Sequence, residues 1–230
     1  MVGVMVTRAE SAAVTRRALL DAAAVLLDLG GLEAVTLREV GARAGVSRGA
    51  PYRHFTGKDS LLTAVVTEGW ERIADRVHAL RIDPGLSACD RLRGALRALI
   101  GVGRDQPHLY QMLFRRPGHR PEELGEGGDR VRGRLCAPVP GTAGGPAADR
   151  IRAAGRFQDE FLAVVTGLVG ERNAPHYGAL LLAGAHGIAD MELSGHLGAG
   201  GLRASCDELV DTLVRLVAGD GATARTPETA

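Results

Sequence analysis

The chain has 230 residues, of which 45% are hydrophobic and 24% are charged. This composition is typical of folded proteins and allows one large domain, or a small domain beside a larger one. The formal net charge of +1 excludes a uniformly basic surface, so a DNA-binding function would require the positive charge to be concentrated in one place.

The cysteines and the hydropathy pattern indicate the cellular compartment in which the protein is expected. Cys89, Cys136 and Cys206 are far apart, form no CxxC pair and are odd in number, which favours a reducing, cytoplasmic compartment over a disulfide framework. No apolar run approaches the length of a membrane span, and the first residues lack the features of a signal peptide. We therefore expect no membrane partner, and we expect disordered tails at residues 1–12 and 220–230.

Helical periodicity dominates the chain. Apolar residues recur at three- and four-residue spacing, which predicts helices at about 14–29, 36–44, 47–55, 59–80, 87–102, 107–116, 124–135, 149–170, 175–197 and 203–218. Capping boxes are expected at three helix starts, Thr36–Glu39, Thr56–Asp59 and Ser87–Asp90. Glycine and proline are expected to end helices at Gly30-Gly31, Gly45, Pro84-Gly85 and Pro117-Gly118, and residues 137–146 to form a loop.

The segment from Thr36 to Lys58 has the plan of a helix-turn-helix. Two short helical patterns are joined by Ala44-Gly45-Val46, where glycine permits a sharp turn and Val46 is expected to pack between the helices. Ser47 is expected to begin the second helix, whose first residues would meet base edges in the major groove of DNA.

Positive charge is concentrated in this same segment. It holds five basic residues against the single acidic residue Glu39, a net +4 in a chain whose net charge is +1. Such an asymmetry is what a phosphate-binding surface requires. The alternative, which charge alone leaves open, is a solvated basic face.

The full pattern, TLREVGARAGVSRGAPYRHFTGKDSLLTAVV, resembles the DNA-binding domain of the TetR (tetracycline-repressor-like) family of transcriptional regulators. The resemblance covers about residues 14–66 and depends on the turn Ala44–Ser47, the run Tyr52–Phe55 and Lys58 at fixed spacing. It implies an all-α fold. A three-helix DNA-binding domain at 13–66 would precede a larger helical bundle at 67–219 that binds a ligand and dimerises.

The resemblance also implies which residues contact DNA: Thr36, Arg38, Arg48, Gly49, Ala50, Tyr52, His54 and Lys58. Arg48, Gly49 and Ala50 would lie at the base-reading start of the recognition helix, and Lys58 would contact phosphate. Alternatives remain for two of them, since Tyr52 could belong to the core and His54 could be a helix C-cap. Phe55 is expected in the core. Pro51 departs from the family's commoner aliphatic residue, but it is tolerated in a first helical turn.

The C-terminal part resembles the WHG-type domain of some TetR-like regulators, through Pro107–Pro117 and Leu180–Leu197, although the tryptophan of that pattern is absent. Apolar and small residues of the last two helices are expected to form a four-helix interface between two subunits, namely Leu180, Ala183, Gly184, Gly187, Leu209, Leu213 and Leu216. The alternative for each is an intramolecular helix seam.

A ligand pocket is expected between the middle helices. The aromatic and soft residues available for it are Tyr110, Met112, Phe114, Phe157, Phe161 and Tyr177, for each of which core packing is the favoured alternative.

Catalytic and metal sites are not indicated. His186, Glu192 and His196 lack the spacing of a metal site, and no HExxH, nucleophile elbow, phosphate-binding loop or dinucleotide motif occurs. We therefore expect no enzyme activity, no metal and no cofactor.

The sequence predicts a ligand-responsive repressor that binds a palindromic operator in double-stranded DNA as a homodimer and answers to an unknown small-molecule effector. Two alternatives remain: a helical enzyme or small-molecule carrier that uses the C-terminal cavity, and an activator of the same family.

Overall fold

A computed structural model of the chain describes residues 7–114, 144–198 and 203–223, and all regular structure within these ranges is helical. The helices are α1 (Arg8–Ala34), α2 (Leu37–Arg43), α3 (Ala50–His54), α4 (Lys58–Ile82), α5 (Ala88–Asp105), α6 (Pro107–Phe114), α7 (Pro146–Val169), α8 (Ala174–Leu193) and α9 (Cys206–Thr223), with a short 3-10 turn at His196–Gly198. The predicted all-α fold is confirmed. The helix predicted at 124–135 and most of the loop at 137–146 lie outside the described residues.

The N-terminal helix is longer than its apolar pattern indicated. It begins at Arg8, where Thr7 and Glu10 form a complete capping box, so the predicted tail at 1–12 is too long. At its other end, helical backbone angles are interrupted at Gly30 and Gly31, whose φ is +65°, and one more turn follows to Ala34. The glycine pair therefore breaks the helix, as its conformational freedom predicts, but does not terminate it.

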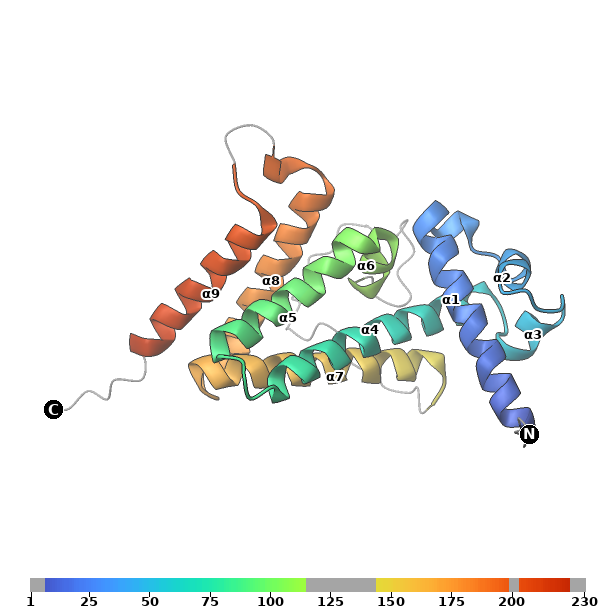
Figure 1. Cartoon of the computed structure of the whole chain (residues 1–230), viewed down its shortest axis with the longest axis horizontal. Helices are drawn as coiled ribbons and strands as arrows, with labels where there is room; N and C mark the ends of the chain where they lie inside the picture. Colours follow the sequence, from blue (N-terminus) through green and yellow to red (C-terminus); the bar gives the residue numbers. More distant parts are fainter. Residues whose placement is uncertain (1–6, 115–143, 199–202, 224–230) are drawn as a thin grey trace, which may run out of the picture.

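Helices α1, α2 and α3 form a small unit at one end of the molecule (Figure 1). Leu19, Ala23 and Leu27 of α1 are buried against Val40 of α2 and Phe55 at the end of α3. This apolar contact is the core of the N-terminal domain, and it confirms that Phe55 is a core residue.

Local capping explains where the short helices begin. Thr36 caps α2, because its hydroxyl accepts a hydrogen bond from the Glu39 backbone N–H at 3.1 Å, as predicted. Ser47 does not begin α3, which starts three residues later at Ala50. A start at Ser47 would place Pro51, which has no N–H, where the first intrahelical bond is needed. The later start places it in the first turn, where no donor is required.

Of the two remaining capping predictions, one is confirmed and the other is wrong. Ser87 caps α5 through the Asp90 backbone N–H at 3.1 Å, as predicted. Thr56 does not cap α4: Gly57 precedes the helix, and no side chain supplies a capping hydrogen bond.

Helix α4 connects the two parts of the chain. It starts beside α3 and continues into the C-terminal bundle, where it lies along α7, with α5, α6, α8 and α9 completing the bundle (Figure 1). The expected domain boundary at 66–67 therefore falls within a helix. Arg156 of α7 bonds Glu71 and Asp75 of α4, each at 2.6 Å, and these surface pairs line the edge of an apolar seam. Helix α9 extends to Thr223, into the predicted tail.

The packing of α3 on α2 depends on one glycine. A Cβ placed on Gly41 would lie 2.8 Å from Cγ of Pro51, closer than packed atoms come. The backbone N–H of Val46 also bonds the Gly41 carbonyl at 3.1 Å, and the half-buried Val46 side chain packs at this junction as expected. A residue without a side chain thus lets the proline ring seat directly on α2.

We predict that Gly41→Ala destabilises the chain by about 1–3 kcal/mol, because the rigid proline ring cannot move away from the added methyl group. Gly155→Ala is the matched control, since a Cβ there meets no atom within 4 Å and alanine favours the helix. Urea unfolding measures both. Equal stability of the Gly41 variant and the wild type would show that the contact is unimportant.

Candidate nucleic-acid interface and ligand sites

Most of the predicted DNA-contact residues are exposed on the N-terminal unit. Thr36 and Arg38 are exposed at the start of α2, Arg48 and Gly49 are exposed in the turn before α3, and Tyr52 is 63% exposed on α3. Tyr52 is therefore a surface residue, which removes the alternative that it belongs to the core. His54 is half-buried at the last position of α3, so both of its interpretations stay open.

Ala50 differs from the other predicted contacts. It is only 3% exposed, because it lies on the side of α3 that packs inward with Pro51. Its interpretation as a base-facing residue is not supported by this burial. Because α3 begins at Ala50 and not at Ser47, Ala50 lies on the inner side of the first turn of the helix.

The arginines of the helix-turn-helix segment have no acidic partner within the described ranges. Arg38, Arg43, Arg48 and Arg53 are all exposed, and none of them forms an ion pair with another described residue. Arginines elsewhere, such as Arg81 and Arg93, are bonded to carboxylates of a neighbouring helix. The local charge of the helix-turn-helix is thus left free to attract an external anion.

Lys58 has an intramolecular partner that the sequence did not indicate. Its ammonium donates a hydrogen bond to the backbone carbonyl of Leu32, at the end of α1, with Nζ 2.6 Å from the oxygen. An ammonium has three donors, so a phosphate contact stays possible as a prediction. No local signal could reveal this bond, because it joins residues 26 positions apart.

Arg53 and Gly41 are two residues that the sequence reasoning missed. Arg53 neighbours Tyr52 on the exposed side of α3, and the sequence indicates it only through its charge and its place in the run Tyr52–Phe55. Gly41 seats Pro51. Its position beside Tyr52 could have indicated Arg53 as a DNA-contact residue. Only the three-dimensional packing identifies the role of Gly41.

A polar contact, which we call the α1–α6 joint, connects α1 with Gln106, the residue before α6, and with His108 of α6. The side-chain amide of Gln106 donates to Oδ2 of Asp28 at 3.2 Å, and the His108 ring lies over Gly31, with Cε1 3.2 Å from where a Cβ would be. Burial raises the pKa of the Asp28 carboxyl, although the Gln106 hydrogen bond and the nearby His108 and Arg72 act to lower it. The joint therefore holds a carboxylate at an energetic cost.

Most of the predicted pocket residues form a packed aromatic cluster. The ring centroid of Trp70 lies 5.1 Å from that of Phe157 and 5.6 Å from that of Phe114, and Phe157 lies 5.9 Å from Phe161. Phe157 and Phe161 are fully buried, in agreement with the core-packing alternative. The half-buried Met112 packs against the same core. Tyr177, on α8, is half-buried against the same core and forms a ring contact with His176.

Tyr110 and Phe114 also face a hollow between α6 and α8, of about 440 Å³, which we call the α6–α8 hollow. The Tyr110 hydroxyl lies 2.9 Å from Nδ1 of His186, and the His186 ring stacks on Tyr110 at a centroid distance of 5.5 Å. Burial raises the pKa of the Tyr110 hydroxyl well above its usual value, so the hydroxyl keeps its proton.

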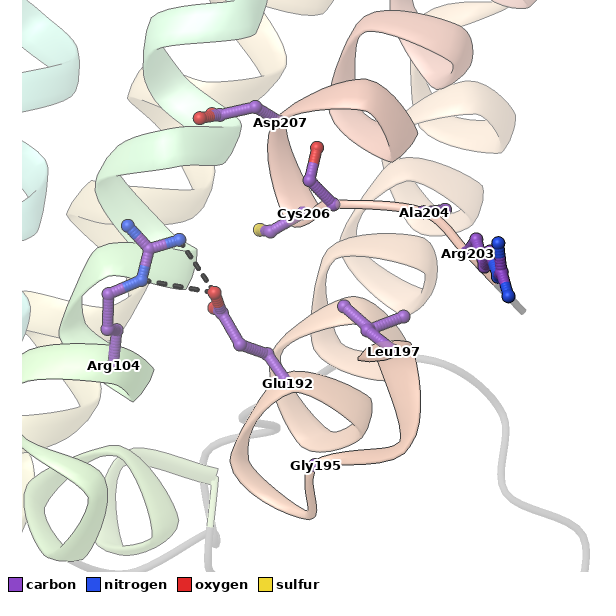
Figure 2. A pocket seen from close by; sticks show the side chains of 9 residues that line it. Arg104, Glu192, Gly195, Leu197, Arg203, Ala204, Cys206 and Asp207 are labelled. Carbon is purple, nitrogen blue, oxygen red and sulfur yellow. Dashed lines mark hydrogen bonds and ion pairs between the residues drawn. The ribbon is translucent and has the colours of Figure 1, made fainter. Parts of the chain in front are cut away.

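The three residues considered for a metal site lie in separate interactions. His186 bonds Tyr110, His196 bonds Ser194, and Oε1 of Glu192 accepts from Nε and Nη2 of Arg104 at 3.1 and 2.8 Å (Figure 2). Within the described ranges, no group of three His, Cys, Asp or Glu side chains is arranged to hold a metal ion.

The Arg104–Glu192 pair borders a hollow of about 670 Å³ between the end of α8 and the start of α9 (Figure 2). Cys206 lines it, and burial raises the pKa of that thiol. No described helix is long and apolar enough to cross a membrane.

The predicted dimer residues divide between surface and interior. Leu180 of α8 is 52% exposed and Leu216 of α9 is 65% exposed, and Ala183 and Gly187 are exposed beside them. Of the other three, Leu209 and Leu213 are half-buried against the core, and a Cβ on Gly184 would lie 3.1 Å from Leu213, a contact between α8 and α9 of one chain. This contact favours the intramolecular alternative for Gly184 and Leu213, and both interpretations stay open for Leu209.

We predict that Lys58→Met destabilises the DNA-free protein by about 1–2 kcal/mol, because the Leu32 carbonyl loses its charged donor. Arg53→Met is the control, as Arg53 is exposed and has no hydrogen bond or ion pair with another described residue, so its variant should stay within about 0.5 kcal/mol of wild type. Guanidinium unfolding without DNA measures both. Unchanged stability of the Lys58 variant would contradict a structural role.

Known proteins resemble the two parts of the chain. Residues 19–65 match the family described as bacterial regulatory proteins, tetR family, and residues 92–217, more than half of the chain, match the tetracyclin repressor-like C-terminal domain. The HTH-type transcriptional repressor KstR of Rhodococcus jostii is 33% identical over 100 residues, which is 44% of this chain and 46% of that protein. The HTH-type transcriptional regulator BetI of Paraburkholderia xenovorans is 33% identical over 40% of this chain and 45% of its own length.

These matches span less than half of each relative's length, so the relatives' activities are not assigned to this chain.

Solved structures share the fold over nearly the whole chain. A protein of unknown function from Rhodococcus sp. RHA1 has a TM-score of 0.66 at 23% identity, covering 90% of this chain and 94% of its own. A TetR-like transcriptional regulator from the same organism has a TM-score of 0.56 at 18% identity, covering 93% and 98%. The helix-turn-helix and the two family matches together establish that the chain belongs to the TetR family of DNA-binding transcriptional regulators.

Proposed function

We propose that the chain is a ligand-responsive repressor that binds a palindromic operator as a homodimer in the cytoplasm. The observation that carries this proposal is the cluster of exposed arginines on α2, α3 and the turn between them, which have no acidic partner among the described residues. The family membership supports the same conclusion, and the α1–α6 joint offers a route by which a ligand could act.

The roles of the DNA-facing residues follow from their positions. Arg48 precedes α3, where a guanidinium can form a bidentate contact with guanine. Thr36 and Arg38 would contact the DNA backbone or an adjoining base, and Tyr52 would contact phosphate, which fixes register without reading sequence. Arg53 joins this set as an additional phosphate-contacting residue.

A homodimer is supported by the apolar surface of the last two helices. Leu180 and Leu216 are each more than half exposed, and the small residues Ala183 and Gly187 allow close approach of another helix. Burial of this surface in a second copy would form a four-helix interface and place two recognition helices on one operator.

The response to a ligand would pass through the α1–α6 joint. Gln106 and His108 of the larger domain contact Asp28 and Gly31 of α1, and α1 is in turn bonded to α4 through Lys58. A ligand that binds better when α6 is displaced would shift α1 and change the separation of the two recognition helices. Such a shift requires different ligand affinities in the two states.

We predict that selection from a random pool of duplexes yields a palindromic site, and that Arg48→Ala loses about 1–3 kcal/mol of discrimination at one position of each half-site. Arg53→Ala should instead weaken binding to all duplexes about equally and reduce the salt dependence of the affinity. Fluorescence anisotropy at several salt concentrations measures both. No enrichment of any sequence, with equal DNA affinity in both variants and wild type, would refute the proposal.

We predict that Leu180→Glu together with Leu216→Glu converts the dimer to a monomer, because burying two unpaired carboxylates is unfavourable. The matched control is Val14→Glu with Leu29→Glu, which changes two exposed apolar residues of α1 instead. Sedimentation velocity should report a dimer for wild type and control. A wild-type monomer, or a dimer unaffected by the α8–α9 changes, would overturn the interface.

A further inference from the structure

A basic hollow lies beside the joint that connects the two domains. It has a volume of about 580 Å³ and is lined by residues of α4, α5 and α6 and by Gln106, which lies between the last two helices. Its rim carries Arg72 and Arg76 of α4 and Arg97 and Arg104 of α5, with Asp105 as the sole acidic residue of the lining. We call this hollow the arginine trough.

The floor of the trough is apolar. Ile73, Val102 and Leu109 contribute aliphatic side chains, and Leu109 packs over Gly69, with its Cδ atoms 3.4 Å from where a Cβ would be. A Cβ added to Gly101 would meet no atom within 4 Å, so space is open above that residue. A basic rim over an apolar floor is complementary to a molecule that carries both a negative group and an apolar body.

The four arginines are not equally engaged. Arg97 is bonded to Asp207 at 2.8 Å, and Arg104 to Glu192 at 2.8 Å, so these two are held by α9 and α8. Arg72 forms an ion pair with Glu68 at 3.7 Å and acts electrostatically on Asp28, and Arg76 forms no ion pair with a described residue. Arg72 and Arg76 are one helical turn apart on the same face, an arrangement of like charges that a bound anion would relieve.

We infer that the arginine trough binds a small amphipathic anion, a carboxylate or phosphate ester attached to an apolar chain, between Arg72 and Arg76. Gln106 lines the same trough, and its amide is the donor that holds Asp28 of α1. The Arg72 guanidinium also stabilises the Asp28 carboxylate electrostatically. A bound anion therefore competes with Asp28 for both groups and loosens the α1–α6 joint. Only this consequence for DNA rests on the proposed function.

The binding test uses three ten-carbon amphiphiles that differ in head group: decanoate, decanol and decyltrimethylammonium, each kept below its micelle concentration. Isothermal titration calorimetry with the full chain should show decanoate binding at least about tenfold more tightly than decanol, and no binding of the cation. Inorganic phosphate tests the head group alone and should compete with decanoate. Equal affinity for all three amphiphiles would overturn the inference.

Two sets of variants locate the site. Arg72→Gln with Arg76→Gln should weaken decanoate binding at least about tenfold, whereas the exposed Arg172→Gln should not. Gly101→Leu should fill the trough and abolish binding, with an unchanged or higher melting temperature, since leucine favours the helix and the space is open. Gly167→Leu, at an equally open glycine of α7, is its control. Undiminished binding by Gly101→Leu would place the ligand elsewhere and refute the inference.

A separate measurement tests whether decanoate changes operator binding. Decanoate should release the selected operator from the wild type but not from Gly101→Leu. If decanoate binds in the trough and the operator stays bound, the proposed release of DNA by the ligand is refuted, and the inferred ligand site is retained. If Arg72→Gln with Arg76→Gln weakens operator binding and leaves decanoate binding unchanged, the arginines serve DNA and the ligand site is wrong.

Discussion

The seating of α3 on α2 is the contact on which DNA binding by this chain depends. A helix of five residues cannot hold its own conformation in water, so α3 exists only because its inner side is packed. Ala50 and Pro51 provide that inner side, and Gly41 provides the space opposite the proline ring. The outward direction of Tyr52 is fixed by the same contact.

Much of this arrangement could be predicted from sequence, because it arises from local patterns. The apolar spacing of the helices, the caps at Thr36 and Ser87, and the core position of Phe55 all depend on residues within a few positions of one another. The start of α3 could not be predicted so simply, since two local preferences conflict there. The capping tendency of Ser47 favours an early start, and the missing donor of Pro51 enforces a later one.

Contacts between distant residues were beyond sequence reasoning. The bond from Lys58 to the Leu32 carbonyl and the bond from Gln106 to Asp28 join different helices, and neither has a local pattern. Together they connect the DNA-binding unit to the bundle at the point where Gly30 and Gly31 interrupt α1. The arginine trough lies beside this point, so a binding site, a polar joint and a break in a helix occur in one region of the fold.

Amide hydrogen exchange of the full chain, with and without the selected operator duplex, tests most directly whether the exposed face of α2 and α3 binds DNA. We predict slower exchange in peptides covering residues 36–58 when the duplex is bound, and unchanged exchange along α7. Slower exchange confined to the C-terminal helices, with residues 36–58 unaffected, would contradict the account.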